Sequence, residues 1–176
     1  MPIYTKKGDK GLTKTFHGAM SKSDDLAEAL GSIDELNSWI GLIRQRYTIY
    51  DIRFMKLEVE LKRIQTNLMT MASILAGSTK YEIRDMRYET RRLEKLIDKL
   101  TAELPPLSNF IYPLGELQVA RAVARRAERQ LVRYMKSDIR YMNKTIMKYI
   151  NRLSDAIFTM ARWVNFKMEI PEETWK

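Results

Sequence analysis

The stretch LAEALGSIDELNSWIGLI, residues 26–43, decides the fold class of this chain. Its apolar residues recur at spacings of three and four, which is the period of one face of an α-helix. Asp24 precedes the stretch and is a residue type that often caps a helix N-terminus, so we expect a helix from about residue 24 to about residue 47. The apolar positions expected to face the core are Leu26, Leu30, Ile33, Leu36, Ile40 and Ile43.

The same spacing continues along the chain and predicts four further helices. Gly77 ends the second helix, Pro105 and Pro106 follow the third, and Gly115 precedes the fourth. Amphipathic helices joined by short loops predict an all-α fold, an antiparallel five-helix bundle of the ferritin-like up-down type. The four further helices are expected over about residues 52–75, 81–100, 116–135 and 138–167.

Length and composition indicate one soluble domain. The chain has 176 residues, which fits a single domain over residues 1–176, with an ordered loop at 1–22 and the helical bundle at 24–167. Cys is absent, which excludes disulfides, thiolate metal sites and cysteine nucleophiles. No apolar run is long enough to span a membrane and no secretory signal pattern opens the sequence, so we expect a cytoplasmic protein without membrane attachment.

The formal net charge of +9 indicates a polyanionic partner: nucleic acid, a membrane surface or a phosphorylated small molecule. Tyr47, Tyr50 and Tyr134 near Arg residues would suit a basic helical protein that binds nucleic acid. That alternative leaves two polar helix faces, at Asp34 and at Asn151, unexplained. We therefore expect a phosphorylated small molecule and no nucleic acid.

The N-terminal stretch YTKKGDKGLTKT, residues 4–15, combines two glycines three residues apart with hydroxyl and ammonium groups. Such a stretch suits a phosphate cradle, because glycine lets backbone N–H groups converge on an anion. It is not a P-loop, since Leu12 follows Gly11 where Lys and Ser or Thr would stand. A solvated basic turn is the alternative reading of this stretch.

Three helices carry polar residues that share one face. Asn, Ser and Gly are poor helix formers, so the face in the first helix indicates a functional or closely packed surface. Arg is suited to bidentate phosphate contacts, although a surface helix laced with ion pairs is the alternative for the fourth helix. The faces comprise Asp34, Asn37, Ser38 and Gly41; Arg121, Arg125, Glu128 and Arg129; and Asn151, Ser154, Asp155 and Phe158.

The sequence offers no side-chain set for nucleophilic catalysis. His17 is the only histidine and is expected to be an ordinary loop residue. There is no Cys–His pair and no Ser–His–Asp set with a histidine outside that loop. An enzyme of this sequence would therefore position reactants and supply charge, while the bound reactants carry the chemistry.

Four blocks together resemble the propanediol-utilisation (PduO) type of ATP:cob(I)alamin adenosyltransferase. They stand in that family's order and span nearly the whole chain. The blocks are YTKKGDKGLTKTF at 4–16, LGSIDELNSWIG at 30–41, FIYP at 110–113 with VARAVARRAER at 119–129, and YINRLSDAIFTMAR at 149–162.

The resemblance implies a five-helix bundle that assembles as a homotrimer, with ATP between neighbouring subunits. The implied reaction is attack by Co(I) of the substrate cobalamin on the ribose 5′ carbon of ATP, with triphosphate leaving. Mg²⁺ would accompany ATP, and no metal site of the protein's own is implied. A member that has lost catalysis and only senses ATP or corrinoid is the alternative.

The resemblance also implies residue roles. Asp34 would form an ion pair with Arg121 that shapes the corrinoid site, and Arg125 would complete the catalytic set. Phe110, with Asn37 nearby, would lie against the lower face of the cobalt and displace its axial ligand. The residues implied to contact ATP are Thr5, Gly8, Asp9, Lys10, Gly11, Thr13, Lys14, Lys22, Arg125, Arg126, Glu128, Arg129 and Asn151.

Overall fold

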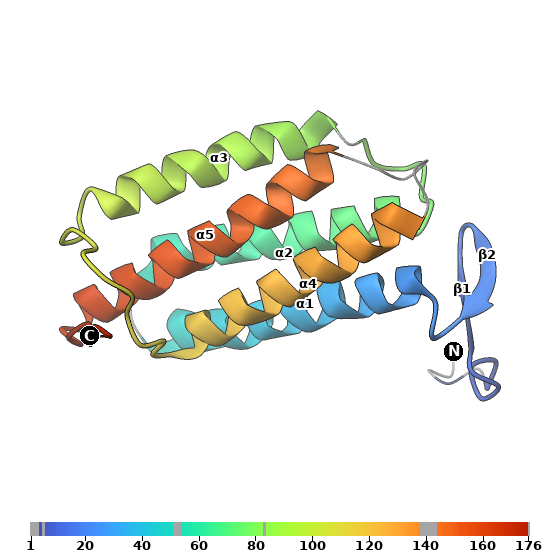
Figure 1. Cartoon of the computed structure of the whole chain (residues 1–176), viewed down its shortest axis with the longest axis horizontal. Helices are drawn as coiled ribbons and strands as arrows, with labels where there is room; N and C mark the ends of the chain where they lie inside the picture. Colours follow the sequence, from blue (N-terminus) through green and yellow to red (C-terminus); the bar gives the residue numbers. More distant parts are fainter. Residues whose placement is uncertain (1–3, 5, 51–53, 83, 138–143, 176) are drawn as a thin grey trace.

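The computed structural model of the chain describes residues 4, 6–50, 54–82, 84–137 and 144–175. Within these residues the chain forms five long helices and one small sheet, which confirms the predicted all-α bundle (Figure 1). Consecutive helices run in opposite directions, and the long connection between α3 and α4 crosses one end of the bundle (Figure 1). The elements are β1 (Leu12–Thr15), β2 (Gly18–Ser21), α1 (Asp25–Tyr50), α2 (Met55–Leu75), α3 (Arg84–Thr101), α4 (Glu116–Ser137) and α5 (Lys144–Lys167).

The N-terminal segment contains regular structure that the sequence did not predict. Residues 12–21 were expected to be loop, but β1 and β2 pair as an antiparallel hairpin with Leu12 opposite Ser21 and Thr15 opposite Gly18. Each strand has only four residues, so each face carries two side chains and the alternation is too short to recognise. The expected helix limits agree with the structure to within a few residues, except that the expected starts of the second helix at 52 and of the last helix at 138 lie outside the described residues.

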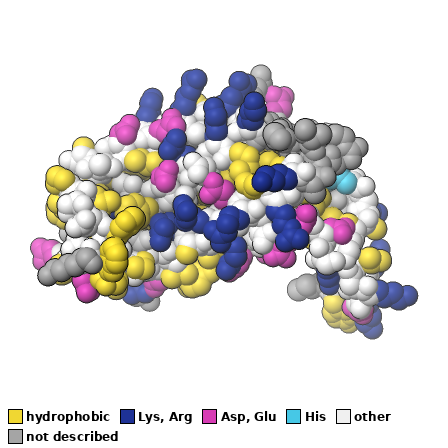
Figure 2. Space-filling view, viewed as in Figure 1, with side chains coloured by type: hydrophobic (Ala, Val, Ile, Leu, Met, Phe, Trp, Pro, Cys, Tyr) yellow, Lys and Arg dark blue, Asp and Glu magenta, His cyan; other side chains and the backbone are white. Residues whose placement is uncertain are grey.

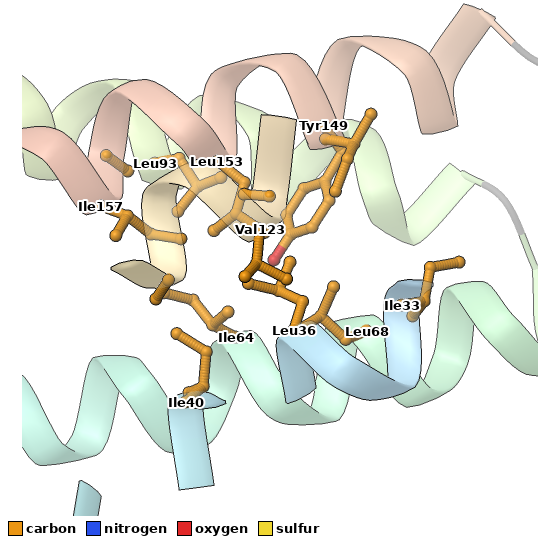
Figure 3. Close-up of a cluster of buried hydrophobic side chains, with 14 of the residues drawn as sticks. Ile33, Leu36, Ile40, Ile64, Leu68, Leu93, Val123, Tyr149, Leu153 and Ile157 are labelled. Carbon is orange, nitrogen blue, oxygen red and sulfur yellow. The ribbon is translucent and has the colours of Figure 1, made fainter. Parts of the chain in front are cut away.

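The core lies between the helices and contains the predicted apolar positions of α1. Five of the six expected positions are buried, and Leu30 is half-buried against the core. Burying a side chain of this size stabilises the fold by about 1.5–3 kcal/mol, so this stripe holds α1 in place. Figure 3 shows side chains from all five helices turned toward one another: Ile33, Leu36, Ile40, Ile64, Leu68, Leu93, Val123, Tyr149, Leu153 and Ile157.

A buried carboxylate joins α2 to α3. Glu89 is only 8% exposed and accepts hydrogen bonds from Arg63 at 2.8 and 2.5 Å and from Asn67 Nδ2 at 2.9 Å. Burial raises the pKa of Glu89, but the hydrogen bonds from Arg63 and Asn67 outweigh it, so the pKa lies below its ordinary value. The folded state therefore favours the ionised carboxylate.

The lowered pKa of Glu89 makes the stability of the fold depend on pH. A carboxyl group with a lowered folded-state pKa contributes stability above its unfolded pKa and loses it as the pH falls through the folded value. We expect Glu89→Gln to be about 1–3 kcal/mol less stable than wild type near pH 7, because Arg63 loses its charged acceptor. The difference in stability between the two proteins should shrink as the pH falls below 4.5, the ordinary pKa of a glutamate side chain. Urea unfolding at several pH values measures this, and a difference that does not change with pH would contradict it.

The surface carries its charge and its apolar groups in different places. Figure 2 shows Lys and Arg side chains over α3 and over the middle of the face formed by α4 and α5, with hydrophobic side chains at the end where α3 connects to α4. None of the described helices has both the length and the apolar character needed to cross a bilayer. The exposed apolar side chains of the connection are Leu107, Phe110, Tyr112 and Leu114.

Candidate functional site

A cavity of about 620 Å³ lies at the connected end of α3 and α4. Residues 107–111 and Pro113 form one wall, and α4 and α5 form the others. Phe110 is 81% exposed and stands at this cavity with two cationic side chains of α4, Arg121 and Arg125. Apolar side chains on one wall suit a flat, largely apolar molecule, and the guanidinium groups opposite them suit an anion bound beside it. The residues of α4 and α5 that line the cavity are Gln118, Arg121, Arg125, Ser154, Asp155, Phe158 and Thr159.

Arg121 is oriented by its own surroundings and not by Asp34. Its Nε donates to Gln118 Oε1 at 2.7 Å, and its guanidinium lies 5.9 Å from the centre of the Phe158 ring. Asp34 is exposed on α1, and no ion pair joins it to Arg121 within the described chain. The expected ion pair is therefore not formed inside one chain.

The N-terminal hairpin covers a second, open cavity of about 1020 Å³. Thr13, Lys14 and Lys22 line it together, as expected for residues of one binding site. Apolar side chains form the rest of its wall, and the remaining lining residues are Thr15, Phe16, Met20, Ala27, Leu30 and Ala76.

The turn before β1 packs against Lys22. A Cβ at Gly8 would lie 3.1 Å from Lys22 Nζ, and the backbone N–H of Lys22 donates to the carbonyl of Gly11 at 2.8 Å. Glycine at position 8 therefore leaves room for the end of Lys22, while Gly11 has a φ of +75°, a conformation that favours glycine. Asp9 and Lys10 of the same turn are exposed, and Thr5 lies outside the described residues.

His17 attaches the hairpin to the end of α2. Its Nε2 lies 3.2 Å from the carbonyl oxygen of Leu75, and the N–H of Phe16 donates to the carbonyl of Ala76 at 2.9 Å. Gly77 has a φ of +90°, and a Cβ there would lie 2.7 Å from the His17 ring. His17 was expected to be an ordinary loop residue, whereas in the structure it holds the hairpin against the end of α2.

Substitution of Gly77 should release the hairpin from the bundle. Gly77→Ala places a Cβ into the His17 ring on a backbone that side chains rarely adopt, at a cost of about 1–3 kcal/mol. We expect amide hydrogens of residues 12–21 to exchange faster in this variant while the helices remain protected. Gly31→Ala is the matched control, because nothing lies within 4 Å of its Cβ position. Equal exchange of the hairpin in both variants would contradict the role of His17.

The Arg face of α4 links the first cavity to a smaller one. Arg125 lines both the Phe110 cavity and a cavity of about 270 Å³ formed with Glu128, Arg129 and Val132. Asn151 Nδ2 of α5 donates to Glu128 Oε1 at 2.8 Å, so two predicted nucleotide residues are in contact. The structure thus brings these predicted residues together on one surface of α4 and α5.

Arg126 lies apart from that surface. It forms an ion pair with Glu35 of α1 and so has a role in attaching α4 to α1. This ion pair by itself accounts for an arginine at position 126, without the predicted contact with ATP.

The polar face of α1 is explained partly by close packing. Gln65 Nε2 of α2 donates to the carbonyl of Asn37 at 2.9 Å and would lie 3.1 Å from a Cβ at Gly41. Arg44 in turn donates to Gln65 Oε1 at 2.6 Å and pairs with Glu58. Among the described residues, the buried Oδ1 of Asn37 has no hydrogen-bond partner, which leaves one acceptor at a predicted corrinoid residue.

The cobalamin adenosyltransferase family matches residues 3–164 of the sequence. The chain belongs to this family. Family members from Bacillus subtilis and Homo sapiens, both corrinoid adenosyltransferases, are each 40% identical to it, over 97% and 94% of this chain and 90% and 69% of theirs. Variants of the PduO-type ATP:corrinoid adenosyltransferase of Lactobacillus reuteri have the same family fold. One, complexed with cobalamin and ATP, has a TM-score of 0.89 and 34% identity over 99% of both chains; another, complexed with ATP, has a TM-score of 0.87.

Sequence reasoning missed part of the lining of the Phe110 cavity. Gln118 holds Arg121, and Leu107, Ser108 and Asn109 form the wall beside Phe110. The connection has no periodic pattern, so only its exposed apolar residues in a Pro-rich loop could have indicated a binding wall.

Proposed function

We propose that this chain is an enzyme that transfers the 5′-deoxyadenosyl group of ATP to the cobalt of cob(I)alamin. The Co(I) lone pair forms the new Co–C bond with the ribose 5′ carbon. The C5′–O bond breaks, and its electron pair leaves with the triphosphate, so cobalt is formally oxidised to Co(III). The reaction needs no protein nucleophile, because the Co(I) of the substrate is itself the attacking group.

The position of Arg125 is the observation that carries this proposal. It stands between the apolar cavity with Phe110 and the polar surface with Arg129 and Glu128. A flat corrin ring suits the first, and a triphosphate suits the second because guanidinium groups bind phosphate oxygens in pairs. Arg125 can therefore stabilise the charge that develops on the leaving triphosphate. Mg²⁺ enters with ATP, bound to the phosphate oxygens.

We propose further that the active enzyme is a homotrimer with ATP between subunits. The hairpin lies at the start of α1, and the α3–α4 connection, which carries Phe110, lies at the opposite end of the bundle (Figure 1). At about 1.5 Å per residue the 26 residues of α1 span about 39 Å, so the hairpin and the Phe110 loop of one chain lie at opposite ends of that length. A hairpin from one subunit placed against α4 of the next would complete a site that one chain leaves divided.

The trimer is expected to be required for turnover. Light scattering coupled to size-exclusion chromatography should give three times the chain mass under assay conditions. Dilution until the assembly dissociates should abolish activity, because the hairpin and the Arg face then no longer meet. An active monomer at working concentration would contradict the shared site.

The decisive test of the reaction is an absorbance assay with ATP and chemically reduced cobalamin. Conversion of the cob(I)alamin spectrum to that of adenosylcobalamin, with triphosphate released in equal amount, supports the proposal. Binding of ATP and cobalamin without conversion would instead identify a member that has lost catalysis.

A further inference from the structure

The C-terminal segment pairs with the loop that carries Phe110. An isolated antiparallel bridge joins Ile111 to Thr174. The N–H of Trp175 donates to the carbonyl of Phe110 at 2.8 Å, and the N–H of Tyr112 donates to the carbonyl of Glu173 at 2.9 Å. The backbone on both sides of Ile111 is therefore fixed by a segment that lies more than sixty residues further along the chain.

A buried arginine attaches the same segment to α5. The Arg162 side chain is only 6% exposed, and it donates from Nε and Nη2 to the two carboxylate oxygens of Glu172 at 2.5 and 2.9 Å. Its Nη2 also donates to the carbonyl of Pro105 at 3.0 Å. A buried guanidinium needs its carboxylate partner, so this pair fixes where the segment begins.

Other contacts hold both ends of the α3–α4 connection to α5. Glu103 accepts from Trp163 Nε1 at 3.0 Å and pairs with Lys167 at 2.8 Å. At the other end, Asn165 Nδ2 donates to the carbonyl of Leu114 at 3.2 Å. The ends of the connection are thus set by α5, while its middle, with Phe110, is set by the C-terminal segment.

We infer that residues Glu172–Trp175 act as a positioning element that places Phe110 over the Phe110 cavity for the corrinoid. The side chain of Phe110 is 81% exposed, so packing around the ring does little to fix it, and the backbone hydrogen bond from Trp175 sets its position. The inference rests on the proposed function. It predicts that loss of the pairing affects corrinoid turnover and leaves ATP binding unchanged, because none of residues 172–175 lines the hairpin cavity or the cavity at Arg129.

The sharpest test removes one hydrogen bond. Trp175→Pro lacks the N–H that donates to Phe110, whereas Trp175→Ala loses the same indole side chain and keeps the N–H. We expect Trp175→Pro to raise KM for cob(I)alamin or lower kcat by about tenfold, with KM for ATP within about twofold of wild type. Trp175→Ala should stay near wild type. Wild-type kinetics in Trp175→Pro would overturn the inference.

A spectroscopic measurement reports the position of Phe110 directly. Cob(II)alamin with its lower nitrogen ligand shows nitrogen splitting in the EPR spectrum, and a ring that displaces the ligand removes that splitting. With ATP and cob(II)alamin bound, Trp175→Pro should retain more of the splitting than wild type or Trp175→Ala. Equal spectra for all three would overturn the inference.

Glu172→Gln extends the test to the anchor, with Glu173→Gln as its matched control. Glu173 is exposed and contributes its backbone carbonyl to the pairing, so its substitution removes the same charge and leaves Arg162 its partner. We expect the corrinoid defect in Glu172→Gln alone, with helical circular dichroism unchanged in both. The same corrinoid kinetics in the two variants would contradict the inference. A wild-type enzyme that fails to convert cob(I)alamin would contradict the proposed function itself and is a separate result.

Discussion

Arg125→Ala is expected to lower kcat/KM by about a hundredfold or more, which corresponds to a few kcal/mol of lost transition-state stabilisation. Arg125 is the side chain shared by the Phe110 cavity and the polar surface of α4. The charge on the leaving triphosphate increases as the C5′–O bond breaks, so a guanidinium at this junction acts mainly on the transition state. The loss should therefore appear in kcat, measured with both substrates saturating.

Arg133→Ala is the matched control for Arg125→Ala. Arg133 lies two turns further along α4, is 71% exposed and pairs with Asp25 at 2.8 Å on the surface. An exposed ion pair contributes about 0–1 kcal/mol, so this variant should keep nearly full activity and stability. Comparable losses of activity in the two variants would mean that the overall positive charge of α4, and not the position of Arg125, supports the reaction.

Arg121→Met is expected to have the next largest effect, a fall in corrinoid turnover of at least about tenfold. The Arg121 guanidinium lies in the Phe110 cavity, held by Gln118 on one side and by the Phe158 ring on the other. Arg121→Lys should not restore activity, since an ammonium group lacks the planar fork that fits this position. ATP binding, measured by calorimetry, should change little in either variant.

A double-mutant cycle decides whether Asp34 acts with Arg121. Asp34 is exposed in the single chain and does not reach Arg121 there, so any pairing requires a neighbouring subunit. If the two act as a unit, the turnover of the double variant Asp34→Asn, Arg121→Met should be little worse than that of the worse single variant. Losses that add in free energy would show that the two residues act separately.

Periodic segments made the bundle predictable. The apolar spacing of residues 26–43 depends only on local helix geometry, so it identified α1 and its buried face without any knowledge of the partners. The same reasoning located the Arg face of α4 and the polar face of α5, and the structure places Arg125, Glu128, Arg129 and Asn151 on one surface.

Residue partners across the fold were not predictable in this way. The family resemblance implied Asp34 as the partner of Arg121. In the structure Arg121 instead contacts Gln118 and Phe158. Gly41 was expected on a functional or closely packed face, and the structure shows close packing there: Gly41 makes room for Gln65 of α2. Such contacts depend on the rotation and offset of packed helices, which a one-dimensional pattern does not contain.

The sequence by itself determined the five helices, the core positions along them and the concentration of Lys and Arg side chains in the N-terminal stretch and on α4. Only the tertiary structure decided that His17 and Gly77 attach the hairpin, and that Glu172–Trp175 pair with the loop of Phe110. The physical reason is the range of the interactions involved. Helix periodicity arises from contacts within a few residues. The hairpin attachment and the Phe110 pairing instead join segments about sixty residues apart, and such isolated contacts leave no repeating pattern in the sequence.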